Sequence, residues 1–117
     1  MREQNVIVEV SYAFALEVMS LSKLMRDKKE YDLASQFWRS GTSIGANVEE
    51  AQAAQSRADF ISKMSIAAKE TRESRYWLRL AQDGMILPAG QLETALERID
   101  AILRILNSII ISTKDRQ

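Results

Sequence analysis

The sequence predicts an all-α protein, an up-down-up-down four-helix bundle in which residues 1–117 form a single domain. Apolar residues recur every three or four positions through most of the chain, which is the spacing of one helical face. Four such segments follow one another with short connections between them, and short connections make consecutive helices antiparallel neighbours. The length of 117 residues is also typical of one domain.

The first predicted helix runs from about Asn5 to Lys29. The β-branched opening, Val6 to Val10, leaves a strand as the alternative for its first residues. The charged run from Arg26 to Glu30 indicates a solvated turn rather than a binding patch. The apolar face of this helix consists of Ile7, Val10, Phe14, Val18, Leu21 and Met25.

The second predicted helix, Tyr31 to Gln55, is the central one. Its two glycines, Gly41 and Gly45, each cost about 1 kcal/mol relative to alanine inside a helix. Close approach of a neighbouring backbone would offset that cost, so we expect this helix to pack on more than one side. Its inward face consists of Leu33, Phe37, Ser40, Ile44, Val48 and Ala51.

The third predicted helix runs from Arg57 to Asp83, after a capping box made by Ser56 and Asp59. Gly84 is the expected C-terminal stop. The inward seam consists of Phe60, Met64, Ala67, Thr71, Ser74, Leu78 and Ala81. Ile44 and Leu78 lie centrally on the apolar stripes of the second and third helices, so we expect both to be core residues.

The fourth predicted helix runs from Gln91 to Ser112. Pro88 lies either just inside it, where its missing N–H costs nothing, or in the preceding loop. Residues 114–117 are expected to form a frayed tail. One apolar stripe consists of Leu92, Leu96, Ile99, Leu103, Leu106 and Ile110, and Ala95, Ile102 and Ile109 widen it.

A polar stripe runs beside the apolar face of the central helix. It indicates either a ligand or partner site or a buried hydrogen-bond network that fixes helix register, and we favour the network. Arg39 or Arg72 could pair with Glu50 or Glu73 across the bundle, and Asn47 is expected to be buried and hydrogen-bonded. The predicted network consists of Gln36, Arg39, Ser40, Ser43, Asn47, Glu50 and Glu73.

Basic and aromatic residues alternate on the third helix, a pattern that can hold phosphates and stack bases. The candidate nucleic-acid contacts are Lys69, Arg72, Arg75, Tyr76 and Arg79. Residues 57–84 contain six basic and four acidic side chains, a surplus of only two, and the whole chain has a formal net charge of zero. We therefore favour a solvated face or a protomer interface over a nucleic-acid site.

The composition argues against catalysis. The chain has no cysteine and no histidine, so it lacks thiolate nucleophiles and the commonest general base and metal ligand. No catalytic, cofactor-binding or metal-binding residue is predicted. A metal site at Glu49, Glu50, Glu70 and Glu73 is the alternative to surface carboxylates, but the di-iron pattern of bundles needs Glu-x-x-His pairs.

The sequence predicts neither a membrane span nor a signal peptide. No apolar run approaches the roughly 20 residues that a span needs, and the first ten residues carry charges where a signal peptide is apolar. We therefore expect a cytoplasmic protein.

Apolar residues outside the main seams predict self-association. One bundle core needs an apolar stripe roughly 100° wide on each helix, and the third and fourth helices exceed it. A symmetric homo-oligomer would bury the surplus. The residues concerned are Ile61, Ile66, Trp77, Leu80, Ile105, Ile109, Ile110 and Ile111.

Three sets of residues resemble a known family: Gln36-x-x-Arg39-Ser40-x-x-Ser43-Ile44-x-x-Asn47-x-x-Glu50, then Phe60 with Lys63-Met64-x-Ile66-Ala67, then Lys69-Glu70-x-x-Glu73-x-x-Tyr76-Trp77-Leu78. They resemble the bacterial four-helix-bundle family named after proteins encoded in intervening sequences of 23S ribosomal RNA genes. Many members have Asn-Ile-Ala-Glu-Gly where this chain has Asn47-Val48-Glu49-Glu50-Ala51.

This resemblance implies a left-handed bundle and a ring-shaped homopentamer without an established activity. A related branch comprises accessory proteins of diversity-generating retroelements, which bind a reverse transcriptase and nucleic acid. Two hypotheses follow. The first is a non-enzymatic oligomeric scaffold or adaptor with an unknown protein partner. The second is a nucleic-acid-binding accessory protein that partners a reverse transcriptase, whose binding would weaken steeply with salt.

Overall fold

The computed structural model describes residues 2–116 of the chain, with side chains from Asn5 onward. Within that range the chain forms four long helices: α1 (Arg2–Asp27), α2 (Tyr31–Gln52), α3 (Arg57–Asp83) and α4 (Ala89–Lys114). The molecule is elongated, with extents of 48 × 21 × 19 Å. The all-α four-helix bundle predicted from the sequence is confirmed.

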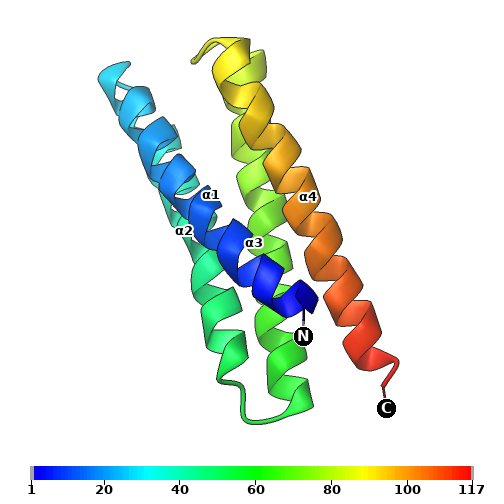
Figure 1. Ribbon diagram of the computed structural model, residues 1–117. Coiled ribbons are helices and arrows are strands. Elements are labelled where there is room, and N and C mark those ends of the chain that lie inside the picture. The colour runs from blue at the N-terminus through cyan, green and yellow to red at the C-terminus, as the bar shows by residue number, and fades with distance from the viewer. Residues whose placement is uncertain (1, 117) are drawn as a thin grey trace.

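Each helix packs against its neighbours in sequence, and α1 also packs against α4. The diagonal pairs α1–α3 and α2–α4 do not approach each other, so the four helices form a square up-down-up-down arrangement. Figure 1 shows the α1–α2 turn and the α3–α4 loop at one end of the bundle, with the α2–α3 connection and the C-terminus at the other. The α1–α4 contact is the least extensive of the four.

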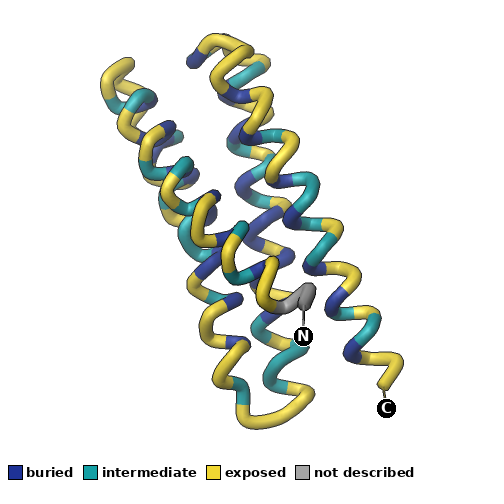
Figure 2. The backbone as a smooth tube through the Cα atoms, viewed as in Figure 1, coloured by how far each residue is buried: buried dark blue, intermediate teal, exposed yellow. Residues whose placement is uncertain are grey.

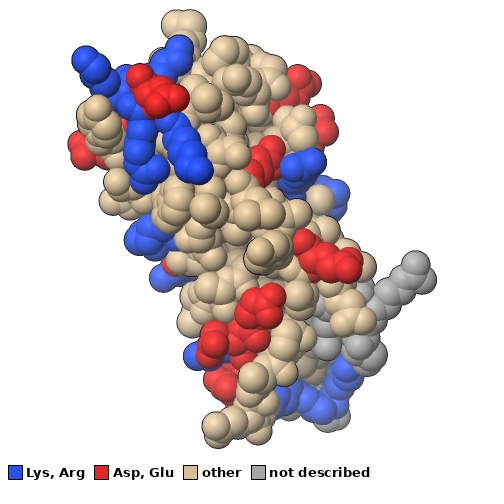
Figure 3. Space-filling model, turned by 60° about the vertical axis from the view of Figure 1, so that its left-hand side comes forward, with Lys and Arg blue, Asp and Glu red and all other residues tan. Residues whose placement is uncertain are grey.

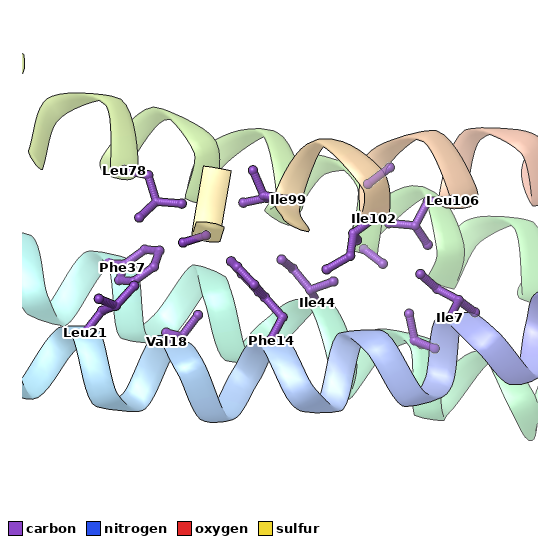
Figure 4. Close-up of a cluster of buried hydrophobic side chains, with 14 of the residues drawn as sticks. Ile7, Phe14, Val18, Leu21, Phe37, Ile44, Leu78, Ile99, Ile102 and Leu106 are labelled. Carbon is purple, nitrogen blue, oxygen red and sulfur yellow. The ribbon is translucent and has the colours of Figure 1, made fainter. Parts of the chain in front are cut away.

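Buried positions recur along all four helices on their inward sides (Figure 2). The core is mostly apolar, and Figure 4 shows apolar side chains from every helix converging in it. Ile44 and Leu78 are both fully buried, as predicted. The largest fully buried side chains are Phe14, Phe37, Ile7, Met25, Ile44, Met64, Leu78, Leu92, Ile99, Ile102, Leu106 and Val18.

The inward face of α4 is rotated relative to the prediction. Ala95, Ile102 and Ile109, which were expected only to widen the stripe, are buried, whereas Leu96 and Leu103 are half-buried. The face turns because α4 packs against α3 and α1 together. An apolar stripe in the sequence does not by itself show which side of α4 faces inward, between α3 and α1.

The helix boundaries differ from the prediction by a few residues. The strand alternative for Val6 to Val10 is wrong, because α1 is helical from Arg2. The second helix ends at Gln52 rather than Gln55, and the fourth extends from Ala89 to Lys114. Pro88 precedes the first helical residue, so the loop alternative for that proline holds.

Two helices end with a non-glycine residue in the left-handed conformation. Lys29 has φ 65° and Met85 has φ 55°, and in each case the N–H of the next residue reaches back to a carbonyl five positions earlier. This is the Schellman hydrogen-bond pattern, in which glycine is the usual residue. Gly84 follows the last residue of α3 as predicted, but with φ −81°, so Met85 rather than Gly84 makes the turn.

The N-terminus of α3 is capped much as predicted. The Ser56 hydroxyl accepts a hydrogen bond from the Asp59 N–H at 3.0 Å. The Asp59 carboxylate accepts in turn from the N–H of Gln55, at 3.3 Å, rather than from that of Ser56. The reciprocal bond of the capping box therefore lies one residue earlier than expected.

The two glycines of α2 let α1 approach closely. A Cβ atom on Gly45 would lie 3.3 Å from the backbone oxygen of Ser11, and one on Gly41 would lie 2.5 Å from Cγ2 of Val18. The prediction of close backbone approach is confirmed at Gly45. At Gly41 the neighbour is instead the side chain of a fully buried valine.

One segment of α1, Asn5–Asp27, is long and apolar enough to cross a membrane by length and composition, with a mean hydropathy of 1.3. This differs from the expectation that no such segment exists. The core helix of a bundle passes the same test, and the apolar side chains of α1 at Ile7, Phe14 and Val18 are buried against the other helices.

Candidate functional site

The polar stripe of α2 faces α3, but only part of it reaches across the interface. Arg39 and Ser40 make hydrogen bonds to α3, and Glu73 on α3 is one of the acceptors. Ser43 and Asn47 are half-buried, and Gln36 and Glu50 are exposed. The seven predicted residues therefore do not form one buried network.

Arg39 is the centre of the interhelix cluster. Its Nη1 donates to Oε1 of Glu70 at 3.1 Å, and its Nη2 donates to Oε2 of Glu73. The indole N–H of Trp77 donates to the same Glu73 oxygen at 3.1 Å. Glu70 is only 7% exposed, so Arg39 neutralises a buried carboxylate. Of the pairings left open between Arg39 or Arg72 and Glu50 or Glu73, the structure shows Arg39–Glu73. Glu70 was not predicted to join it, although a spacing of three puts both carboxylates on one helical face.

Below this cluster, two serines join the helices inside the core. The Ser74 hydroxyl donates to the Ser40 hydroxyl oxygen at 2.8 Å, and both residues are fully buried. The sequence placed Ser74 on the apolar seam of α3 and gave no sign of this bond. A buried side chain-to-side chain hydrogen bond of this kind fixes how far α2 can slide along α3.

The remaining stripe residues bond to their own helix. The Ser43 hydroxyl donates to the carbonyl of Arg39 at 2.6 Å, and the Asn47 amide donates to the carbonyl of Ser43 at 2.8 Å. Asn47 was expected to be buried and hydrogen-bonded; its amide is hydrogen-bonded, but the residue is half-buried rather than buried. Among the described residues, Glu50 forms no ion pair.

The cluster changes the acidity of two groups. The hydrogen bond to Glu73 raises the pKa of Arg39, although burial acts against it. Burial alone would raise the pKa of the Glu73 carboxyl, but the hydrogen bonds from Arg39 and Trp77, with the charge of Arg39, lower it below 4.5. Both shifts favour the ionised forms of Arg39 and Glu73.

The basic residues of α3 divide into two groups. Lys69, Arg72, Tyr76 and Arg79 are exposed. Arg75 instead pairs with Asp100 of α4, its Nε lying 2.8 Å from Oδ1. The ring of Tyr76 packs edge-on against Trp77, with centroids 5.1 Å apart. Four of the five candidate nucleic-acid contacts therefore remain accessible, and Arg75 contributes to the α3–α4 interface.

The described part of the chain contains no group of three His, Cys, Asp or Glu side chains placed to hold a metal ion. Of the four carboxylates considered for a metal site, Glu70 and Glu73 pair with Arg39. Glu49 and Glu50 are exposed on α2.

Replacing Arg39 with methionine is expected to lower the free energy of unfolding at pH 7 by about 1–2 kcal/mol, because the Glu70 carboxylate loses its charged donor. The expected loss is smaller than for a fully buried ion pair, because the Arg39 side chain is half-exposed and water screens its charge. Glu73 has a lowered pKa in the folded state, so its contribution is present above the unfolded-state pKa and disappears as the pH falls through the folded value. Chemical denaturation at pH 7 and pH 3 should show the difference from wild type narrowing at the lower pH.

The matched control is Arg98→Met, which removes the exposed ion pair with Glu17 at 2.9 Å. It should cost less than about 1 kcal/mol. An Arg39→Met variant no less stable than Arg98→Met would show that the cluster does not stabilise the α2–α3 interface.

Comparison with known proteins identifies two similarities. The family model described as 23S rRNA-intervening sequence protein matches residues 3–108. The chain is also similar to a crystal structure of a protein with unknown function from the S23 ribosomal protein family, from Bacteroides thetaiotaomicron VPI-5482. The identity is 43%, the match covers 92% of this chain and 97% of that chain, and the TM-score is 0.89. A search of curated proteins finds no match.

Proposed function

The chain belongs to the 23S rRNA-intervening sequence protein family, and from that premise we propose that it acts without catalysis, as a self-associating scaffold or adaptor that holds a protein partner. The observation that supports this proposal most directly is its exposed apolar surface. Tyr12 is 64% exposed, Leu16 51% and Ile111 60%, although the bundle core is already complete without them. Apolar surface of this kind usually marks interfaces.

The α2–α3 cluster supports a structural role. Arg39 pairs with both Glu70 and Glu73, and the Ser40 hydroxyl accepts a hydrogen bond from Ser74. These contacts connect α2 to α3 through polar groups that already have partners. A rigid bundle with apolar patches on its outside suits a protein that assembles with other chains.

We expect the isolated protein to self-associate at tens of micromolar. Light scattering coupled to size-exclusion chromatography should give a mass several times 13.3 kDa. The ring-shaped pentamer implied by the family resemblance would be five times that mass. A clean monomer would contradict the scaffold proposal, whereas another multiple would contradict only the number five.

The second candidate function is that of a nucleic-acid-binding accessory protein that partners a reverse transcriptase. The observation in its favour is that Lys69, Arg72, Tyr76 and Arg79 are all exposed on α3. Lys69 is next to Glu70 in sequence and four residues from Glu73, and the chain has no net charge to attract phosphates from a distance. We therefore rank this function second.

At physiological salt we expect only weak binding to RNA or DNA, with a dissociation constant of roughly 10–100 µM or above. Fluorescence anisotropy with labelled single strands measures it. The double variant Arg72→Gln/Arg79→Gln should change the affinity no more than the control Arg104→Gln on α4. Submicromolar binding that falls steeply with salt and depends on Arg72 and Arg79 would reverse the ranking of the two functions.

A further inference from the structure

The outer side of α1 carries a second stripe of residues, separate from its buried face. Its members are spaced alternately three and four positions apart, the spacing by which helices pack along a coiled-coil seam. All six are exposed or half-buried, so no other helix of the bundle covers the stripe. They are Asn5, Glu9, Tyr12, Leu16, Met19 and Lys23.

The middle of this stripe is apolar and lies beside a hollow. Tyr12 and Leu16 are more than half exposed, and Met19 is half-buried one turn further on. A cavity of about 250 Å³ opens between α1 and α2, because α2 presents small residues there and lies close to the α1 backbone. Its walls are Tyr12, Ala15, Thr42, Gly45, Ala46 and Glu49. A side chain from another helix can lie in this hollow.

The two ends of the stripe carry opposite charges. Glu9 lies at one end, and Glu49 of α2 lies at the same end, because α2 runs antiparallel and Gly45 is beside Ser11. Lys23 lies at the other end, close to the α1–α2 turn. Figure 3 shows Lys and Arg side chains gathered near that turn, with acidic groups lower on the same face. Among the described residues, none of these three charges has an ion-pair partner.

Both basic and acidic side chains lie near the α1–α2 turn, and the basic ones predominate. Arg26, Lys28 and Lys29 accompany Lys23, and the carboxylates of Asp27 and Glu30 offset part of this charge. Arg26 lies over the Trp38 ring, 5.1 Å from its centroid, which holds this cation at the side of the stripe. From one end to the other, the stripe is therefore first acidic, then apolar, then basic.

We propose that this face binds a second copy of the same chain, with the two α1 helices antiparallel and a twofold axis between Tyr12 and Leu16. Leu16 of each copy then packs beside Tyr12 of the other and against its hollow. Glu9 of each copy then lies four residues along the axis, about 6 Å, from the other copy's Lys23. A parallel pair would instead place Glu9 against Glu9 and Lys23 against Lys23, so charge selects the antiparallel arrangement.

The inference rests on the self-association in the proposed function and names one face through which it occurs. A twofold contact is self-complementary, so by itself it joins chains in pairs. A ring of five closes through a contact between two different surfaces. In such an assembly the α1 contact would join one ring to another.

Because the chain has no cysteine, single cysteine variants report the contact directly. Mixing Tyr12→Cys with Leu16→Cys under mild oxidation should give a disulfide-linked heterodimer in high yield, detected by intact mass. Glu9→Cys mixed with Lys23→Cys should be joined by a short bismaleimide that spans one helical turn. Glu9→Cys alone should not be joined, and neither should the control Thr94→Cys, at an exposed polar residue of α4.

Charge exchange gives a second readout that does not depend on cysteine geometry. Glu9→Lys should weaken self-association about tenfold, because it creates two repulsive contacts in each pair. The double variant Glu9→Lys/Lys23→Glu should restore wild-type affinity, since both exchanged charges again face opposite ones. Both side chains are exposed, so circular dichroism should show an unchanged fold.

The outcomes separate this inference from the proposed function. An oligomer without Tyr12–Leu16 cross-links overturns the α1 contact and leaves the scaffold proposal standing. A monomer at every concentration overturns both. Efficient cross-linking of Glu9→Cys to itself overturns the antiparallel arrangement.

A membrane surface is the other occupant that the stripe could have. If wild-type protein cosediments with phosphatidylcholine–phosphatidylglycerol vesicles, if Leu16→Glu abolishes this and if no cross-links form, the stripe binds a membrane surface and the inference is overturned.

Discussion

Replacing Ile44 with alanine is expected to lower the free energy of unfolding by about 2–5 kcal/mol, the largest loss expected from any variant considered. Ile44 is fully buried at the middle of α2 and lies within the core shown in Figure 4. Truncation removes apolar surface that folding takes out of water, and it leaves a cavity that the surrounding helices fill only in part. Urea denaturation followed by circular dichroism measures the effect.

Ile111→Ala on α4 is the matched control. It makes the same chemical change at a side chain that is 60% exposed, so it should cost less than about 0.5 kcal/mol to the folded monomer. A loss below 0.5 kcal/mol for Ile44→Ala, or equal losses for the two variants, would show that the core is placed wrongly.

The second large effect is expected at Gly41, where leucine should destabilise the protein by about 3 kcal/mol, the upper end of the usual range for overpacking. The added Cβ alone would lie 2.5 Å from one methyl group of Val18 and 2.7 Å from the other. Val18 is fully buried, and a β-branched side chain has few alternative rotamers, so it cannot move aside. The helices α1 and α2 must therefore separate.

Gly90→Leu is the control for this change. Gly90 lies in the first turn of α4, and nothing is within 4 Å of the place where its Cβ would be. Leucine favours helix more than glycine does, so the control should be neutral or stabilise by up to about 1 kcal/mol. Thermal unfolding should show a lowered melting temperature for Gly41→Leu and an unchanged or raised one for Gly90→Leu. A Gly41→Leu variant as stable as wild type would mean that α1 and α2 are not in close contact there.

Much of the fold could be predicted from the sequence because most apolar residues lie on one face per helix. Phe37, Ile44 and Val48 on α2 are fully buried as their spacing indicates. The orientation of α4 could not be predicted as well. Leucines and isoleucines occupy more than half of its circumference, and the choice of Ile102 over Leu103 as a core residue depends on the position of α1. That position is set by tertiary packing.

The candidate site was predicted in outline but not in its partners. Because only a few charges lie near the expected α2–α3 seam, the sequence narrowed the ion pair to Arg39 or Arg72 with Glu50 or Glu73, but it did not select Arg39 and Glu73. Ser74 could not be assigned to Ser40, since a serine within an apolar seam shows no sign of a hydrogen-bond partner. The exposed Tyr12 and Leu16 were missed for the opposite reason. They lie in an apolar helix, and periodicity does not tell which of two apolar stripes faces inward.

The square arrangement of helices also has a consequence for how the chain folds. Three of its four interhelix contacts join helices that are consecutive in sequence, so each can form after closure of a short loop. Proteins dominated by such local contacts usually fold within microseconds to milliseconds. The contact of α1 with α4 joins the two ends of the chain and is the least extensive. We therefore expect α1 and α4 to dock last, and to separate first when the native state opens transiently.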